Sequence, residues 1–216
     1  MNIIITMAGL GSRFRKAGYY CPKYMIEAKG KTLFDWSMDS LVGYNNNVNR
    51  YVFVVRAEDH AESFIREHCA SYGIQDVKIV ELDYLTDGQA TTCMLAIPHC
   101  NADEAIMVYN IDTYVEPNEM RYKDLSGDGH IPCFHADGNH WSFTRLDDKA
   151  TSSARVGASS SMLLRSERRY AFRITVRWEL IIFHRPDFTG SCMRNFIPMT
   201  AKWRRMRSIS HHCIIL

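Results

Sequence analysis

The sequence predicts an α/β fold in which a mostly parallel, Rossmann-like sheet is flanked by helices. Two observations lead to this prediction. Short runs rich in β-branched residues alternate with segments of helical period through residues 1–149, which is the pattern of strand–helix–strand units. The chain has 216 residues, of which 46% are apolar, and this is enough to bury a substantial core.

Five strands are predicted in order along this part of the chain. Residues 3–7, 50–55 and 105–110 are largely apolar runs of strand length, and residues 77–82 are a run rich in β-branched side chains. We expect the strand at 105–110 to be fully buried. Residues 140–146 alternate between polar and apolar side chains. This alternation favours a further strand, antiparallel to the others.

Three helices are predicted between these strands. Thr32 is a suitable N-cap for a helix that runs to about Tyr44. We expect one face of this helix to contain four residues: Leu33, Trp36, Ser37 and Leu41. A second helix is predicted within residues 58–73 and is closed by Gly73. A short helix over residues 88–97 ends at Pro98.

The chain changes character after Lys149. Residues 1–149 contain 14 Lys and Arg against 21 Asp and Glu, a net charge of −7, whereas residues 150–216 contain 12 against 3, a net charge of +9. The second segment is rich in serine and arginine, and neither a helical nor a strand period persists in it. We therefore predict one α/β domain at 1–149 and an aberrant basic tail at 150–216 that is poorly ordered.

The composition argues against several classes of protein. No apolar stretch approaches the roughly 20 residues of a membrane-spanning helix, and the apolar start of the chain is too short for a signal peptide. The seven cysteines form no C-x-x-C pair and the nine histidines no H-x-x-x-H or H-E-x-x-H pattern, which argues against a disulfide framework and a zinc site. We expect a cytoplasmic protein with no membrane partner.

The strongest chemical signal is the stretch "ITMAGLGSRFRKAGYYCPKY" at residues 5–24. A predicted strand leads into Gly9 and Gly11, and glycines at such a position let backbone N–H groups approach a ligand closely. Arg13 adds a planar cation, and a turn at the Pro-Lys pair adds the ammonium of Lys23. These groups predict a site for a polyphosphate.

Two common phosphate-binding motifs do not fit this loop. The full Walker A pattern, G-x-x-x-x-G-K-S/T, does not occur in the chain. The dinucleotide fingerprint needs a third glycine where Phe14 stands, and an acidic residue at the end of the second strand, where the chain has Arg56. A different class of nucleotide site is therefore indicated.

The pattern G-x-G-S/T-R, followed about ten residues later by P-K, resembles that of the sugar-phosphate nucleotidyltransferases, or nucleoside-diphosphate-sugar pyrophosphorylases, over roughly residues 1–149. The resemblance implies the nucleotide-diphospho-sugar transferase fold, incomplete in this chain. It implies transfer of a nucleoside monophosphate from an NTP to a sugar-1-phosphate, with release of pyrophosphate and no covalent intermediate. The nucleotide-binding residues that it implies in this loop are Ala8, Gly9, Gly11 and Ser12. It implies that Arg13 contacts the β- and γ-phosphates and that Lys23 contacts the α-phosphate or the sugar phosphate.

Two later segments fit the same resemblance. Residues 83–96 resemble the segment that binds the nucleotide base, where Gly88 admits the base edge and Gln89 or Asp87 is a weaker candidate; an ordinary turn before a helix is the alternative. Asp112 follows a predicted buried strand, where the family keeps a metal-binding aspartate at the carboxyl end of the sheet. Oxygen ligands beside a polyphosphate favour Mg²⁺ as the cofactor.

Three questions stay open at this stage. The acceptor can instead be a small phosphorylated alcohol such as phosphocholine, which would make the protein a cytidylyltransferase. The non-enzyme alternative is an inactive remnant that still binds a nucleotide. A role in polysaccharide biosynthesis is implied only by what members of the family commonly do. Trp141 and Phe143 could line a sugar pocket, but their alternation favours a core position.

The tail does not resemble the strands and helices with which this family continues. In a shifted reading frame, residues 186–215 can be read as an amphipathic, charge-balanced sequence similar to that continuation, and Trp203 and Met206 leave little freedom in the reading. We interpret the tail as out-of-frame translation. The alternative is a basic arm for nucleic acid or an acidic membrane, with an arginine cluster at residues 204–207 beside Trp203; we expect no nucleic-acid partner.

Overall fold

The computed structural model describes residues 1–45 and 48–117, together with the backbone of six short strands between residues 129 and 183. Within these residues, none of the helices has the length and apolar character needed to cross a membrane. Side chains are described in 1–45 and 48–117 only, so the following account of packing concerns that part of the chain.

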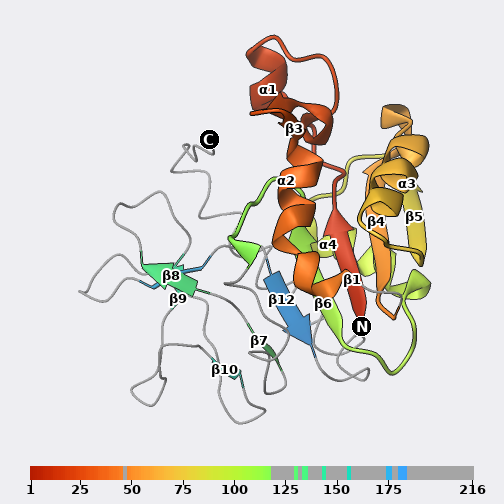
Figure 1. The fold of residues 1–216 in the computed structure, drawn as a ribbon, viewed down its shortest axis with the longest axis vertical. Coiled ribbons are helices and arrows are strands. Elements are labelled where there is room, and N and C mark those ends of the chain that lie inside the picture. Colours follow the sequence, from red (N-terminus) through yellow and green to blue (C-terminus); the bar gives the residue numbers. More distant parts are fainter. Residues whose placement is uncertain are drawn as a thin grey trace.

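A seven-stranded sheet forms the centre of the molecule (Figure 1). Its strand order is β10-β7-β12-β6-β1-β4-β5, and the last four strands in this order are mutually parallel. The bounds of these seven strands are β1 Asn2–Thr6, β4 Arg50–Arg56, β5 Val77–Leu82, β6 Ile106–Asn110, β7 Gly129–His130, β10 Arg155–Val156 and β12 Leu180–Phe183. The predicted fold class, a mostly parallel sheet flanked by helices, is confirmed, as are the four predicted strands of the parallel part.

Two smaller sheets accompany the main one. The strands β8 Cys133–His135, β11 Ile174–Val176 and β9 Phe143–Thr144 form an antiparallel sheet, so the antiparallel strand predicted at 140–146 is present at residues 143–144. The hairpin of β2 Glu27–Ala28 and β3 Lys31–Thr32 leads into the first long helix.

The described part of the chain has four α-helices, with bounds α1 Ser12–Lys16, α2 Leu33–Ser40, α3 Glu62–Ser71 and α4 Gln89–Ala96, and the last three flank the sheet. Helices α2 and α3 cover one face of the sheet and α4 covers the other (Figure 1). Because successive residues of a strand point to opposite faces, Ile3 and Ile5 pack toward α2 and α3, whereas Ile4 packs toward α4. Strands buried on both faces explain why their sequences are continuous apolar runs.

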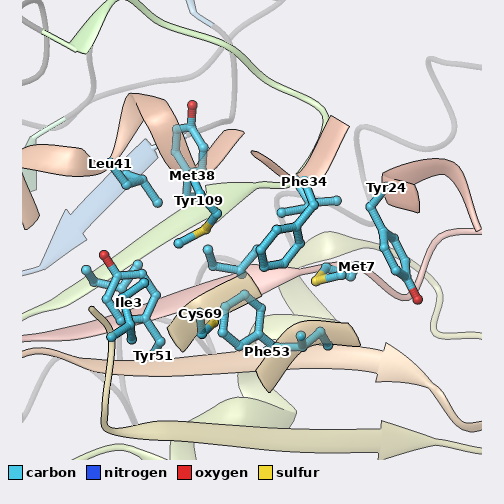
Figure 2. Close-up of a cluster of buried hydrophobic side chains, with 14 of the residues drawn as sticks. Ile3, Met7, Tyr24, Phe34, Met38, Leu41, Tyr51, Phe53, Cys69 and Tyr109 are labelled. Carbon is cyan, nitrogen blue, oxygen red and sulfur yellow. The ribbon is translucent and has the colours of Figure 1, made fainter. Parts of the chain in front are cut away.

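The larger core lies between the sheet and helices α2 and α3 (Figure 2). Phe34 of α2 stacks on Phe53 of β4 with ring centroids 5.7 Å apart, and both side chains are fully buried. Burial of a large apolar side chain contributes about 1.5–3 kcal/mol. Tyr24 lies at one end of this cluster, beside Met7 (Figure 2), and thereby connects the core to the loop that follows β1.

Helix α2 starts where it was predicted to start, but it buries a different face. Thr32 accepts a hydrogen bond from the Asp35 backbone N–H at 3.1 Å, while the Asp35 carboxylate accepts one from the Thr32 backbone N–H, which completes a capping box. Ser37 and Leu41 are buried as predicted, but the large buried side chains are Phe34 and Met38.

The prediction for Leu33 and Trp36 was wrong, because both side chains are only partly buried. The indole Nε1 of Trp36 donates to the Ala28 carbonyl of the preceding hairpin at 2.8 Å, which holds the ring at the surface. The α-helix also ends at Ser40, and the short 3₁₀ helix η2 Val42–Tyr44 follows it, so the predicted end at Tyr44 holds only for the helical region as a whole.

The second predicted helix begins later than expected. Residues 57–59 form a separate 3₁₀ turn, η3 Ala57–Asp59, and His60 has a left-handed φ of 47°, which interrupts helical geometry before α3 starts at Glu62. The end of α3 agrees with the prediction, since Gly73 follows it with a φ of 71°. Pro98 likewise ends α4 and lies in the 3₁₀ helix η4 Ile97–His99.

Three of the described strands lie beyond Lys149, and one of them, β12, pairs antiparallel with β6 over its four residues. Several predictions concern residues that the structure does not describe. These are the tryptophan and arginine cluster at 203–207, the segment 186–215 that was read in a shifted frame, Trp141 and the side chain of Phe143. The division into a domain at 1–149 and an aberrant tail at 150–216 stays a prediction.

Candidate functional site

The carboxyl ends of the parallel strands meet at one edge of the sheet, and the candidate residues gather there. The loop that contains Gly9 and Gly11 leaves the end of β1, and α1 lies beyond that end (Figure 1). Asp112 follows β6, the neighbour of β1 on one side, and Arg56 is the last residue of β4, the neighbour on the other side. Open α/β sheets bind ligands at this edge.

The two glycines of the loop have different structural roles. Gly11 has a φ of 58° and precedes α1, so an L-residue with a side chain would be strained there. A Cβ at Gly11 would lie 3.6 Å from the Cβ of Lys23, which shows how closely the two parts of the loop approach. A Cβ at Gly9 would contact nothing within 4 Å. The space beside Gly9 is therefore open to a ligand.

The other two predicted loop residues flank the glycines. Ala8 is buried, with 5% of its surface exposed, and packs against the α4 face of the sheet. Ser12 is exposed and begins α1.

Lys23 and Asp112 form an ion pair, although 89 residues separate them in the sequence. The Lys23 Nζ donates to Asp112 Oδ2 at 2.7 Å, and the side chains are 17% and 22% exposed. Lys23 starts the 3₁₀ helix η1 Lys23–Met25 after Pro22, whose φ of −53° sets the turn. The pair brings the predicted second cation and the predicted metal ligand to one point.

Tyr24 fixes the position of this 3₁₀ helix. Its ring is 1% exposed, and its hydroxyl donates to Asp59 Oδ2 at 3.0 Å. Burial, together with the negative charge of Asp59 and this hydrogen bond, raises the pKa of Tyr24 well above its ordinary value. The hydroxyl therefore stays a hydrogen-bond donor, and it anchors η1 to η3.

A pocket beside the loop brings together some predicted residues and adds others. Its lining residues are Gly9, Leu10, Gly11, Arg15, Cys21, Pro22, Lys23, Tyr24, Arg56 and Asp59. Arg13 is not among them, whereas Arg15 and Arg56 are. Residues two apart on a helix point in nearly opposite directions, about 200° apart, so the pocket is lined by the second arginine of α1 rather than the first.

Sequence reasoning missed the two pocket arginines for different reasons. Arg15 follows the motif that drew attention to Arg13, and only the helical geometry of residues 12–16 separates them. Arg56 stands at the end of a predicted strand, and that position was a usable signal, because strand ends face the ligand edge of the sheet.

The segment proposed for the base has an open turn followed by α4. Gly88 is the N-cap of α4; its φ of 165° is ordinary extended backbone, and a Cβ there would contact nothing within 4 Å. The side chain of Gln89 is partly buried, and its Nε2 donates to Asn110 Oδ1 at 2.5 Å and to Thr6 Oγ1 at 3.3 Å, at the carboxyl ends of β6 and β1. The carboxylate of Asp87 accepts a hydrogen bond from Thr91.

Asp112 is the residue best placed to hold a divalent cation. In the part of the chain with described side chains, no group of three His, Cys, Asp or Glu residues gathers as a metal site. Asp112 uses Oδ2 for Lys23, and its Oδ1 makes no hydrogen bond within the described residues. This fits Mg²⁺, which is commonly bound by one or two carboxylates together with substrate phosphates.

Comparison with known proteins gives matches among solved structures. A scan against protein-family models and a search of curated proteins found no match. A nucleoside-diphosphate-sugar pyrophosphorylase from Vibrio cholerae RC9 is similar with a TM-score of 0.71 and 30% sequence identity, covering 91% of this chain and 78% of that chain.

Two further structures support the fold alone, because their identities are low. The inositol-1-phosphate CTP transferase from T. maritima has a TM-score of 0.64 and 17% identity, over 88% of this chain and 72% of that chain. HddC from Yersinia pseudotuberculosis has a TM-score of 0.58 and 19% identity, over 84% and 76%. The identity to the Vibrio protein, over more than two thirds of its length, shows that this chain belongs to the nucleoside-diphosphate-sugar pyrophosphorylase family of nucleotidyltransferases.

Proposed function

We propose that this protein transfers a nucleoside monophosphate from an NTP to a sugar-1-phosphate and releases pyrophosphate. The observation that carries the proposal is the Lys23–Asp112 ion pair at 2.7 Å, beside a glycine loop with open space at Gly9. An ammonium and a carboxylate at the ligand edge of the sheet supply a cation for phosphate and an oxygen ligand for a metal.

The proposed reaction is an in-line displacement at the α-phosphorus. An oxygen of the sugar phosphate forms the new bond to phosphorus as the bond to the pyrophosphate oxygen breaks, and pyrophosphate leaves with the electron pair. Such transfers depend mainly on positioning and on neutralisation of charge. No nucleophile on the protein is required.

Each residue of the site has a proposed task in this reaction. The backbone from Ala8 to Ser12 binds the phosphates, and Gly9 leaves room for their approach. Lys23 holds the α-phosphate or the sugar phosphate. Asp112 binds Mg²⁺, which supplies positive charge to the polyphosphate when bound. If Asp112 held the metal, the Lys23 ammonium would be available for phosphate.

Three further residues, Arg13, Gly88 and Gln89, have proposed tasks in binding the nucleotide. The role of Arg13 at the β- and γ-phosphates stays a prediction, since Arg13 does not line the described pocket. Gly88 is proposed to admit the base edge, because the space beside it is open. Gln89 is proposed to support this segment from within the protein, since its amide contacts Thr6 and Asn110.

A cytoplasmic location and a role in polysaccharide biosynthesis stay predictions from the sequence and its family resemblance. The aberrant tail is likewise a proposal, and sequencing of the gene tests it: an intact reading frame without a family-like continuation in the alternative frame would contradict it.

The test combines binding and turnover. The protein is incubated with each NTP, Mg²⁺ and a panel of sugar-1-phosphates and phosphocholine, and pyrophosphate release is measured. Release with a sugar-1-phosphate supports the proposal, release only with phosphocholine favours the cytidylyltransferase alternative, and NTP binding without any release identifies a nucleotide-binding remnant.

Substitution of Lys23 tests the assignment of the site. Lys23→Met removes the cation that faces the reacting phosphates, and we expect the turnover rate to fall about 10²–10³-fold. Lys78→Met is the matched control, because Lys78 is exposed on β5 and does not line the pocket. Equal activity of the two variants would contradict the role of Lys23.

A further inference from the structure

Glu58 lies between two arginines of the pocket. Its carboxylate forms an ion pair with the guanidinium of Arg56, and its Oε1 lies 3.8 Å from Arg15 Nη2. Arg56 ends β4 and Arg15 belongs to α1, so one carboxylate connects the sheet to the helix beyond the glycine loop. Both arginines line the pocket beside Gly9 and Lys23.

The burial of these side chains shows which of them is free to move. The Arg56 side chain is only 15% exposed, whereas those of Glu58 and Arg15 are each 56% exposed. A carboxylate that is already largely hydrated leaves its partner at little cost, because water solvates it both in and out of the ion pair. Arg56 therefore keeps its position while Glu58 is exchangeable.

The three cations that line the pocket are already paired with carboxylates in the described structure. Lys23 is paired with Asp112, and Arg15 and Arg56 share Glu58. A polyphosphate that enters the pocket must replace these carboxylates as the partner of each cation. Asp112 gains an alternative partner when a metal binds, but Glu58 lies on the opposite side of the loop, on η3.

We propose that Glu58 is an internal competitor of polyphosphate for Arg56 and Arg15. Phosphate oxygens displace its carboxylate from the two guanidinium groups, which bind phosphate well through paired N–H donors. The return of Glu58 then favours the release of pyrophosphate. The inference rests on the proposed function, and it adds Arg56 and Arg15 as phosphate ligands and Glu58 as the residue that limits phosphate affinity.

The experiment measures binding of inorganic tripolyphosphate and pyrophosphate by calorimetry, with wild type, Glu58→Gln, Arg56→Met and Glu62→Gln. Glu62→Gln is the matched control: Glu62 has a 58% exposed side chain and pairs with Arg66 on α3, outside the pocket. Both glutamine variants raise the net charge by the same amount, so they separate a local effect from a general one.

We expect Glu58→Gln to bind both anions about threefold to fivefold more tightly than wild type at low salt, with Glu62→Gln close to wild type. Arg56→Met is expected to bind them about tenfold more weakly, as a charge-assisted hydrogen bond is lost. The gain of Glu58→Gln should shrink as salt screens the charges.

Two negative results have different meanings. If wild type binds the anions and Glu58→Gln matches Glu62→Gln, or Arg56→Met matches wild type, the inference is overturned while the proposed function stands. If none of the four proteins binds either anion, both the proposed function and the inference are overturned.

Discussion

The glycine loop and the turn before α4 both reach the carboxyl edge of the sheet, yet their polar groups are held in different ways. Around the loop, charged side chains from distant segments pair with one another, as in Lys23–Asp112 and Arg15–Glu58. In the turn at 86–92, most of the bonded side chains are neutral. Thr86 and Thr92 share a hydrogen bond of 2.6 Å between their hydroxyls, Gln89 donates to Thr6 and Asn110, and the Asp87 carboxylate accepts from Thr91.

The two segments therefore offer different groups to a ligand. Ion pairs that are partly exposed can be exchanged for an anion of higher charge, so the loop suits a polyphosphate. The neutral network is internally satisfied, so the turn offers backbone and the open space at Gly88 rather than side-chain donors. We therefore expect the base to be recognised mainly by backbone groups.

Replacement of Gln89 is the strongest test of this contrast. Gln89→Leu removes the amide donor to Asn110 Oδ1 and to Thr6, although Asn110 Oδ1 keeps the hydrogen bond from Thr6. Two lost hydrogen bonds, each worth about 0.5–1.5 kcal/mol, cost about 1–3 kcal/mol together. We expect the free energy of unfolding in urea to fall by this amount. If the Gln89 amide serves only to hold this segment through Thr6 and Asn110, the order of affinity among the four NTPs should not change.

The control for this change is Gln75→Leu, since Gln75 is exposed at the surface. It should leave both unfolding and NTP preference as in wild type. A changed base preference with wild-type stability in Gln89→Leu would show that Gln89 reads the base directly.

The sequence predicted the strands of the parallel sheet well. Strands β1, β4 and β6 are buried on both faces and appear as nearly continuous apolar runs, whereas the edge strand β5 has exposed Lys78 and Glu81 and was recognised from its β-branched residues. Residues 77–82 coincide with β5 in both bounds. The buried face of α2 was predicted wrongly. Trp36 donates a hydrogen bond to the hairpin, and the helical period of a sequence gives no information on such a contact between two elements. The start of α3 was missed because His60 adopts a left-handed conformation without glycine.

Within the site, local motifs were predictable and pairings between segments were not. The glycines and Lys23 belong to one short motif, and Asp112 follows a recognisable buried strand. The contribution of Arg15 and Arg56 depends on helix orientation and strand order. Glu58 lies in η3, which the sequence placed inside a helix, so its position between two arginines required the structure.

Alanine substitutions at the two loop glycines separate conformation from space. Gly11→Ala forces a side chain into a φ of 58°, and we expect it to lower the free energy of unfolding by about 1–2 kcal/mol. Gly9→Ala adds a Cβ that contacts nothing in the protein, so stability should stay near wild type while NTP affinity falls. Thermal unfolding and calorimetry measure the two effects, and equal stability of the variants would contradict the conformational role of Gly11.

The smallest expected effect on stability concerns a charged contact between two helices, away from the pocket. This contact tests whether only the ion pairs around the glycine loop respond to a ligand. Asp35 lies 2.7 Å from His68 Nδ1, between α2 and α3. Burial of Asp35 opposes its ionisation, but hydrogen bonds from Thr32 and His68 outweigh burial and hold the pKa of Asp35 below its ordinary value. Asp35 therefore stabilises the fold above the pKa of an unfolded aspartate, about 3.9, and this stability is lost as pH falls through the folded pKa.

Asp35→Asn isolates this contribution. At pH 7 we expect the variant to be less stable by up to about 1 kcal/mol, or about 2–4 °C in Tm for a chain of this size. The gap between wild type and variant should stay constant down to about pH 4 and close as pH falls further, because the wild-type carboxyl then becomes neutral as well. NTP affinity at pH 7 should be the same in both proteins, since the Asp35 carboxylate connects two helices away from the pocket. A weaker affinity in the variant would show that a charge outside the pocket contributes to NTP binding. It would then contradict the view that exchangeable ion pairs belong to the glycine loop alone.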